Sequence, residues 1–171
     1  MHKFGILAPF AALLFAAGIA SAADYVAAPL SGGEEVPSND SKARGNATFD
    51  LSDDGTAIEY KLIVANIDNV VASHIHVGPL GVNGPVVAFL FGPAAPGGGA
   101  SNGVIASGTI TAANLVGPLT GHPLSDLVAA MQSGGAYVNV HTNDGVAPTN
   151  TGPGDFPGGE IRAQIRPGGE E

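Results

Sequence analysis

Glycine and proline divide this chain into short apolar segments, and that spacing limits the possible folds more than any other feature. The sequence contains 26 glycines and 13 prolines among 171 residues, placed between apolar segments rather than in a regular repeat. A short apolar segment with turn residues on both sides has room for a β-strand but seldom for a helix. The sequence therefore predicts an all-β protein.

Apolar patterns indicate where the strands lie. Residues 45–51 alternate between apolar and polar side chains, and an Asp-Gly turn at 54–55 leads into residues 57–64, which predicts a hairpin. Other strands are expected at residues 25–30, 70–77, 86–91, 104–111, 136–142 and 160–165. Seven or eight short strands are typical of a Greek-key β-sandwich or a flattened barrel.

One segment has helical spacing, and two others resemble loops. Residues 123–133 place apolar side chains at helical intervals, with Ser125 as the expected N-cap and Gly134 as the expected end. Residues 92–103 and 143–158 are rich in Gly, Pro and Asn and have few side chains to bury. We therefore expect one short helix and two long loops in the β-rich fold.

The N-terminal segment predicts export. Lys3 precedes an almost unbroken apolar run over residues 4–20, which ends in the small residues Ala20-Ser21-Ala22. This is the pattern of a secretory signal peptide over residues 1–22, with cleavage after Ala22, and it predicts a periplasmic or secreted protein. A retained membrane anchor is the alternative, because the run is nearly long enough to span a bilayer. Residues 23–171 then suit a single domain, with no membrane contact after cleavage.

Charge and cysteine content exclude several classes of function. The chain has 15 acidic and 6 basic residues, and cleavage would remove the basic Lys3. An acidic protein without clustered Lys and Arg is a poor partner for nucleic acid or an anionic membrane. There is no cysteine, which excludes disulfides, thiolate catalysis and iron-sulfur ligation. Neither a G-x-S-x-G nucleophile motif nor a P-loop is present.

Three histidines lie in predicted strands with a shared orientation. His74 and His76 are two residues apart, so they occupy one face of their strand, about 6.5 Å apart along the chain. In the later strand, Val138 and Val140 take the apolar side and leave His141 on the opposite side. We therefore expect His74, His76 and His141 on a solvent-accessible face, where they could bind one metal ion. The alternative is that these histidines are exposed and bind nothing.

The type of ligand narrows the choice of metal. Imidazole ligands without sulfur suit copper(II), with zinc as the alternative, and they do not suit calcium or magnesium. His122 lies in a Gly-His-Pro segment, which favours a solvated turn histidine. Asp144 and Asp155 match no calcium-binding spacing, so we expect solvated loop charges at both positions.

The last predicted strand carries two charged side chains that could support the three histidines. Glu160 and Arg162 share one face of that strand, where they could hydrogen-bond to the histidine strands and orient an imidazole. The alternative is a surface ion pair between the two residues, which would contribute little to stability.

Several segments form an ordered series along the chain. In chain order they are Leu30-Ser31-Gly32, Glu34-Glu35-Val36-Pro37, Gly45-Asn46-Ala47-Thr48-Phe49, Ala72-Ser73-His74-Ile75-His76-Val77-Gly78-Pro79, Gly81-Val82-Asn83-Gly84-Pro85-Val86-Val87, Tyr137-Val138-Asn139-Val140-His141-Thr142 and Pro157-Gly158-Gly159-Glu160-Ile161-Arg162 with Gln164-Ile165. Together they resemble the CHRD family, which is named after chordin and is common among bacterial exported proteins. The resemblance implies an immunoglobulin-like or superoxide-dismutase-like sandwich, and it includes the same three histidines.

Two functions remain open from the sequence. The first is an exported metal-binding domain, with copper at His74, His76 and His141 and with superoxide-dismutase-like redox activity. The His-x-His strand is similar in style to the copper strand of copper-zinc superoxide dismutases, although this chain lacks their paired cysteines. The second is a non-enzymatic extracellular protein-binding or matrix module in which the histidines only stabilise the fold.

Overall fold

The computed structural model describes residues 24–169, so the predicted signal peptide at residues 1–22 lies outside the described residues. Eight strands and one α-helix make up most of this region. They are β1 (Tyr25–Ser31), β2 (Arg44–Leu51), β3 (Ala57–Asp68), β4 (Val70–Val77), β5 (Val86–Phe91), β6 (Ala100–Thr111), α1 (Leu124–Gln132), β7 (Ala136–Thr142) and β8 (Ile161–Pro167). Short 3-10 helices occur at Gly32–Glu34, Ala112–Asn114 and Gly117–Leu119.

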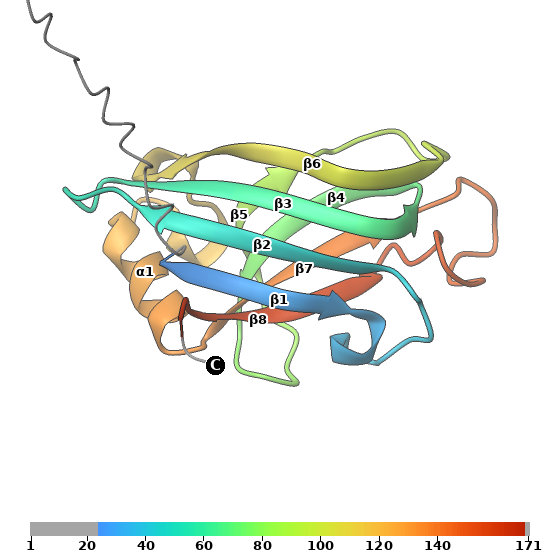
Figure 1. The fold of residues 1–171 in the computed structure, drawn as a ribbon, viewed down its shortest axis with the longest axis horizontal. Helices are drawn as coiled ribbons and strands as arrows, with labels where there is room; N and C mark the ends of the chain where they lie inside the picture. The colour runs from blue at the N-terminus through green and yellow to red at the C-terminus, as the bar shows by residue number, and fades with distance from the viewer. Residues whose placement is uncertain (1–23, 170–171) are drawn as a thin grey trace, which may run out of the picture.

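The strands form one antiparallel sheet that folds over on itself. Its strand order is β5-β4-β7-β8-β1-β2-β3-β6. In Figure 1, β1, β2, β3 and β6 cross the front of the molecule, and β4, β5 and β7 run behind them at an angle. The pairings of β3 with β6, β4 with β7 and β8 with β1 are crossovers between strands that are not consecutive. The predicted all-β class, a Greek-key sandwich or flattened barrel with one short helix, is confirmed.

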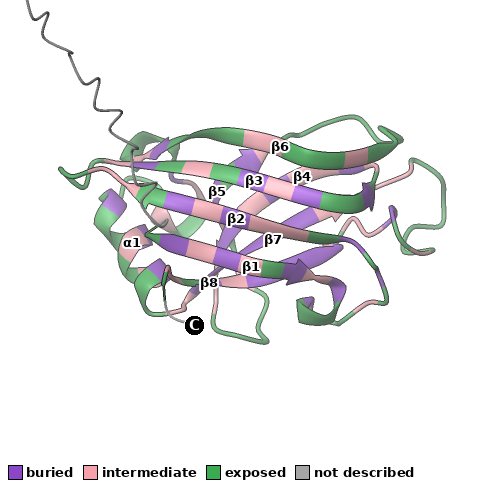
Figure 2. Cartoon of the chain, in the orientation of Figure 1, coloured by how far each residue is buried: buried purple, intermediate pink, exposed green. Residues whose placement is uncertain are grey.

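The hydrophobic core lies between the two layers and takes alternate residues from most of the strands. Buried and more exposed positions alternate along β1, β2 and β3 (Figure 2). Phe49 and Leu62 of the front layer and Ile75, Val138 and Val140 of the back layer are fully buried in one cluster. Because β4 and β7 turn these apolar residues inward, their remaining side chains lie on the outer face of the back layer.

Strand boundaries were predicted best where the apolar pattern is strong. The observed β4, β5 and β7 match the expected ranges, whereas β6 begins at Ala100, inside the predicted loop 92–103. Its first residues pair with the end of β3, where Ile67 lies opposite Ser101 and Asp68 opposite Ala100. The long partner strand extends the pairing into a segment whose own sequence lacks strand character.

The predicted helix is present, with a different start. Its N-cap is Pro123 rather than Ser125, and Gly134, with a φ of 67°, follows its end as expected. The helix buries Leu124, Leu127 and Met131 and packs against β7 and β8. Within residues 24–169, no helix is both long enough and apolar enough to cross a membrane.

Candidate metal centre

Two neighbouring strands bring the three predicted histidines together. His74 and His76 lie on β4 and His141 lies on β7, and these strands pair antiparallel. Ile75, Val138 and Val140 are fully buried in the core, so the imidazoles occupy the opposite face, as the alternation predicts. We call His74, His76 and His141 the histidine cluster.

The spacing of the ring nitrogens suits a single metal ion. One nitrogen from each histidine can be chosen so that all three lie within 4.8 Å of one another. The closest approach joins His74 Nδ1 and His141 Nε2 at 3.1 Å. Ligand atoms about 2.0 Å from a tetrahedral zinc ion lie about 3.3 Å apart. The cluster is therefore close to the size of a metal site, and it is the one such group among the described residues.

Backbone carbonyls determine which nitrogen of two rings is free. His76 Nδ1 lies 2.8 Å from Gly84 O, and His141 Nδ1 lies 2.9 Å from Pro157 O. A carbonyl oxygen only accepts, so each Nδ1 carries a proton and donates, and in a neutral ring Nε2 retains its lone pair. Metal-binding histidines are usually oriented in this way. The Nε2 atom of His76 is buried and has no hydrogen-bond partner within residues 24–169.

Burial keeps all three rings neutral. Desolvation, together with the neighbouring His141 and His76, lowers the pKa of His74 to about 4. Desolvation is also the main reason why the pKa values of His76 and His141 are lowered, although hydrogen bonds to Gly84 and Pro157 oppose it. At neutral pH the cluster therefore presents uncharged imidazoles whose lone pairs do not have to compete with protons.

The face that carries the cluster is more enclosed than the sequence predicts. His76 is only 8% exposed, while His74 and His141 are half-buried. Two loops cover the face: residues 78–85, here called the Gly84 loop, and residues 143–160, here called the Pro157 loop. Access remains on the side of His74, whose ring packs edge-on against the half-exposed Phe89 with centroids 4.8 Å apart.

Arg162 acts on His76 through the Gly84 loop and an aromatic ring. Its Nη1 donates to Asn83 Oδ1 and its Nη2 to Val82 O, both at 3.0 Å. The guanidinium carbon lies 3.4 Å from the centre of the Tyr137 ring, which stacks on His76 at 4.8 Å with 10° between the planes. Arg162 thus holds both the loop that supplies Gly84 O and the ring that supports the imidazole.

Glu160, the last residue of the Pro157 loop, fastens this loop to its surroundings. Its carboxylate accepts hydrogen bonds from Ser41 Oγ at 2.5 Å, Thr142 Oγ1 at 2.6 Å and Gly154 N at 2.9 Å. These bonds tie the loop to β7 and so help to place Pro157 O beside His141. Glu160 and Arg162 are 0% and 1% exposed, so the surface ion pair considered from the sequence is excluded. Both residues hold loops whose carbonyls orient imidazoles.

Two polar residues near the cluster were not predicted to take part. Asn139 is 4% exposed and lies on β7 between Tyr137 and His141. Glu35 is 6% exposed, and burial raises the pKa of its carboxyl to about 7, against lowering by Arg162 and Asn139. Alternation along β7 is the signal that could have placed Asn139 on the histidine face. No local pattern could show that Glu35, more than 100 residues away in sequence, lies beside it.

The remaining predicted residues lie outside the cluster. His122 is exposed and pairs with Asp126 Oδ2 at 2.7 Å, which confirms a solvated turn histidine. Asp144 caps its loop by accepting from Val146 N at 2.8 Å. The prediction for Asp155 was wrong: it is 2% exposed and accepts hydrogen bonds from Thr151 N and Oγ1 at 3.0 Å, because the Pro157 loop folds back on itself.

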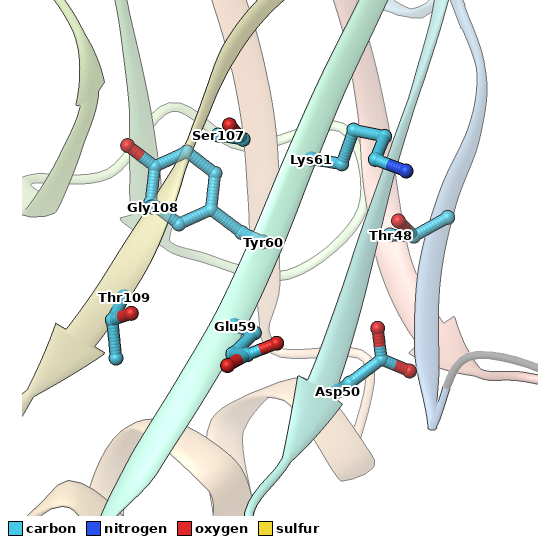
Figure 3. Close-up of a pocket in the computed structure, with 8 residues that line it drawn as sticks. All are labelled: Thr48, Asp50, Glu59, Tyr60, Lys61, Ser107, Gly108 and Thr109. Carbon is cyan, nitrogen blue, oxygen red and sulfur yellow. The ribbon is translucent and has the colours of Figure 1, made fainter.

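A separate pocket lies on the outer face of the front layer, on the other side of the core. It has a volume of about 370 Å³ and is lined by side chains of β2, β3 and β6 (Figure 3). Asp50 and Glu59 lie directly opposite each other there, next to Lys61 and Thr109. All of its charged side chains are exposed, and none of its lining residues is a histidine. It therefore offers no alternative metal centre.

Comparison with known proteins assigns the chain to a family. The family model described as the CHRD domain matches residues 26–165, which include both histidine strands, Glu35, Glu160 and Arg162. The comparisons with curated proteins and with solved structures give no match. The matched region covers most of the sequence and nearly all of the described fold. On this basis, the chain belongs to the CHRD domain family.

Proposed function

We propose that this CHRD domain is an exported metal-binding protein that holds one copper ion, or alternatively zinc, at His74, His76 and His141. The main support is the buried Nε2 atom of His76, which lacks a hydrogen-bond partner in the part of the chain that the structure describes. Its ring is oriented by Gly84 O, and two further neutral imidazoles lie beside it. A buried acceptor without a partner is unfavourable unless a ligand occupies the space in front of it.

The chemistry of the donors favours copper or zinc. Three neutral nitrogen donors without sulfur suit these two ions, and copper(II) binds such sites more tightly than the other divalent first-row metals. Bound copper would supply one-electron redox chemistry, including the dismutation of superoxide. Access beside the half-buried His74 would allow a small molecule to reach the site.

The protein itself orients and shields the donors. The Gly84 and Pro157 carbonyls select the tautomers of His76 and His141, and Arg162 and Glu160 hold the loops that carry these carbonyls. The stacked Tyr137 and Arg162 exclude water from one side of His76. Because these groups are held before an ion binds, little reorganisation is needed.

The proposed location follows from the N-terminal sequence. The signal peptide pattern of residues 1–22 would direct the domain to the periplasm or the medium. Mass spectrometry of protein exported by a bacterial host should find Ala23 as the first residue. Recovery of the intact N-terminus in the membrane fraction would instead support the anchor.

Metal binding can be tested with purified protein. After loading with copper or zinc and dialysis, we expect one metal ion per chain by elemental mass spectrometry. Removing one imidazole in His76→Ala should weaken copper binding at least 100-fold in a competition titration, on the order of 3 kcal/mol. His122→Ala, which removes an exposed histidine outside the cluster, should bind like the wild type.

The same experiment separates the two functions left open by the sequence. A copper(II) paramagnetic resonance spectrum with nitrogen couplings, together with superoxide consumption by the loaded protein, would support the redox site. Binding without superoxide consumption would limit the proposal to metal binding. Wild-type protein that retains neither copper nor zinc would overturn the proposal and leave the non-enzymatic extracellular module.

A further inference from the structure

Buried side-chain atoms without hydrogen-bond partners gather at the histidine cluster, and Glu35 Oε1 beside Asn139 is one of them within the described residues. Two others belong to the paired strands β4 and β7. Within residues 24–169, His76 Nε2 and Asn139 Oδ1 have no hydrogen-bond partner, and their residues are only 8% and 4% exposed. Nearly all buried polar side-chain atoms in folded proteins are hydrogen-bonded or bind a ligand. Two such atoms in one place suggest that both contact the same missing group.

Asn139 lies at the centre of the histidine face. In the antiparallel pairing of β4 and β7 it is directly opposite His74, and in the pairing of β7 and β8 it is opposite Arg162. His141 is two residues further along β7, on the same side of the strand. The amide is therefore surrounded by the residues that form or support the proposed metal site.

The nitrogen end of the Asn139 amide faces Glu35. A Cβ atom built on Gly159 would lie 2.6 Å from Asn139 Nδ2 and 2.7 Å and 2.8 Å from the two carboxylate oxygens of Glu35. The NH₂ group and the carboxyl group thus meet beneath the Gly159 backbone. An amide nitrogen donates and a carboxylate accepts, so this neighbour favours the observed orientation of the amide.

The oxygen end of the same amide is buried without a hydrogen-bond partner within residues 24–169, and so is His76 Nε2. The proton of the neutral His76 ring is on Nδ1, where it is donated to Gly84 O, so Nε2 keeps its lone pair. Nε2 and Asn139 Oδ1 are then two buried acceptors on the same face of the paired strands β4 and β7. Such a pair is unfavourable unless a cation or a donor lies between them.

We propose that Asn139 Oδ1 is a fourth donor to the metal ion of the histidine cluster, with Glu35 orienting its amide group. The inference rests on the proposed metal-binding function and adds a donor to it. A neutral amide oxygen is a weak ligand for copper, comparable to the weak axial oxygen ligands of some copper sites. Three imidazoles would then supply most of the affinity, and the amide would adjust the geometry of the site.

Substitutions of Asn139 can show whether its oxygen binds the metal ion or whether the side chain only fills space. Asn139→Leu keeps the size of the side chain and removes its oxygen, whereas Asn139→Asp keeps an oxygen donor. We expect Asn139→Leu to weaken copper(II) binding at least tenfold and to change the copper hyperfine splitting in the paramagnetic resonance spectrum. Asn139→Asp should bind copper(II) at least as tightly as the wild type.

Matched controls make each outcome decisive. Asn46→Leu, on β2 of the other layer, should leave affinity and spectrum unchanged, and urea unfolding without metal checks that each variant is folded. Wild-type affinity and spectrum in Asn139→Leu would overturn this inference alone. Equal weakening in the Leu and Asp variants would also overturn it, since a structural requirement would then explain both. Wild-type protein that binds neither copper(II) nor zinc(II) would overturn the inference together with the proposed function.

Discussion

At the scale of single residues, hydrogen bonds to backbone carbonyls orient two of the three imidazoles of the histidine cluster. His76 and His141 each donate from Nδ1, to Gly84 O at 2.8 Å and to Pro157 O at 2.9 Å. His74 has a different environment, because its Nδ1 approaches the free Nε2 of His141 at 3.1 Å. His141 Nε2 can only accept, so His74 donates when no ion is bound. Metal binding would replace this hydrogen bond.

The buried carboxyl group of Glu35 predicts how the stability of the fold depends on pH. Burial raises its pKa from the ordinary value of 4.5 to about 7 in the folded protein, so the folded state binds more protons than the unfolded state between these values. Its contribution to stability is therefore complete below about pH 4.5 and is lost as the pH rises through 7. With metal chelated, Glu35→Gln should gain stability relative to the wild type between pH 5 and pH 8, by up to about 3 kcal/mol.

Urea unfolding of both proteins at pH 5 and pH 8 measures this difference. Glu34→Gln, a substitution of the exposed neighbouring residue, is the control and should show a much smaller change. A wild-type and a Glu35→Gln protein whose stabilities run in parallel over this pH range would contradict the prediction.

At the scale of elements, the two loops contribute as much as the strands to the arrangement of the imidazoles. The strands place the imidazoles on one face, but the Gly84 and Pro157 loops provide the carbonyls that orient them. Each loop is tied down by a buried charged residue, Arg162 at the start of β8 for the first and Glu160 immediately before β8 for the second. β8 pairs with β7, so these attachments come from the strand next to His141.

Arg162→Met tests this support. The substitution keeps an unbranched side chain that can fill the space, and it removes the hydrogen bonds to Asn83 and Val82 and the contact with Tyr137. We expect copper affinity to fall about tenfold and the free energy of unfolding to fall by about 2 to 4 kcal/mol. Titration calorimetry and urea unfolding measure the two effects.

Arg166 offers a matched control on the same strand. It is exposed and donates to Ala28 O at 3.0 Å, away from the Gly84 loop. Arg166→Met should change stability little and leave copper affinity unaltered. If Arg162→Met also kept the affinity of the wild type, the Gly84 loop would not need Arg162 to position His76.

At the scale of the whole molecule, the metal should act as a link that the absent cysteines cannot supply. The proposed ligands join β4 and β7, and their supporting contacts reach β8 and both loops. A ligand that binds only the folded state adds about 2.7 kcal/mol at a free concentration 100 times its dissociation constant. We expect copper or zinc to raise the thermal midpoint of the wild type and to leave that of His76→Ala almost unchanged. Equal shifts in both proteins would indicate binding elsewhere.

Much of the back layer could be predicted because strand geometry is local. A period of two places His74 and His76 on one face and Val138 and Val140 on the other, whatever the rest of the chain does. The ranges of β4, β5 and β7 were correct for the same reason. The predictions failed where position depends on a distant partner: β6 begins earlier because β3 pairs with it, and Asp155 is buried because its loop folds back.

By itself, the sequence therefore determined the all-β class, the strands of the back layer and the orientation of three histidines, since all of these follow from alternation within a few residues. Only the tertiary structure decided that β4 and β7 are neighbours, that glycine-rich loops cover the face they share, and that Glu35 and Asn139 meet beneath Gly159. The physical reason is that these contacts join segments distant in sequence, and buried polar groups find their partners only when the whole sheet has closed.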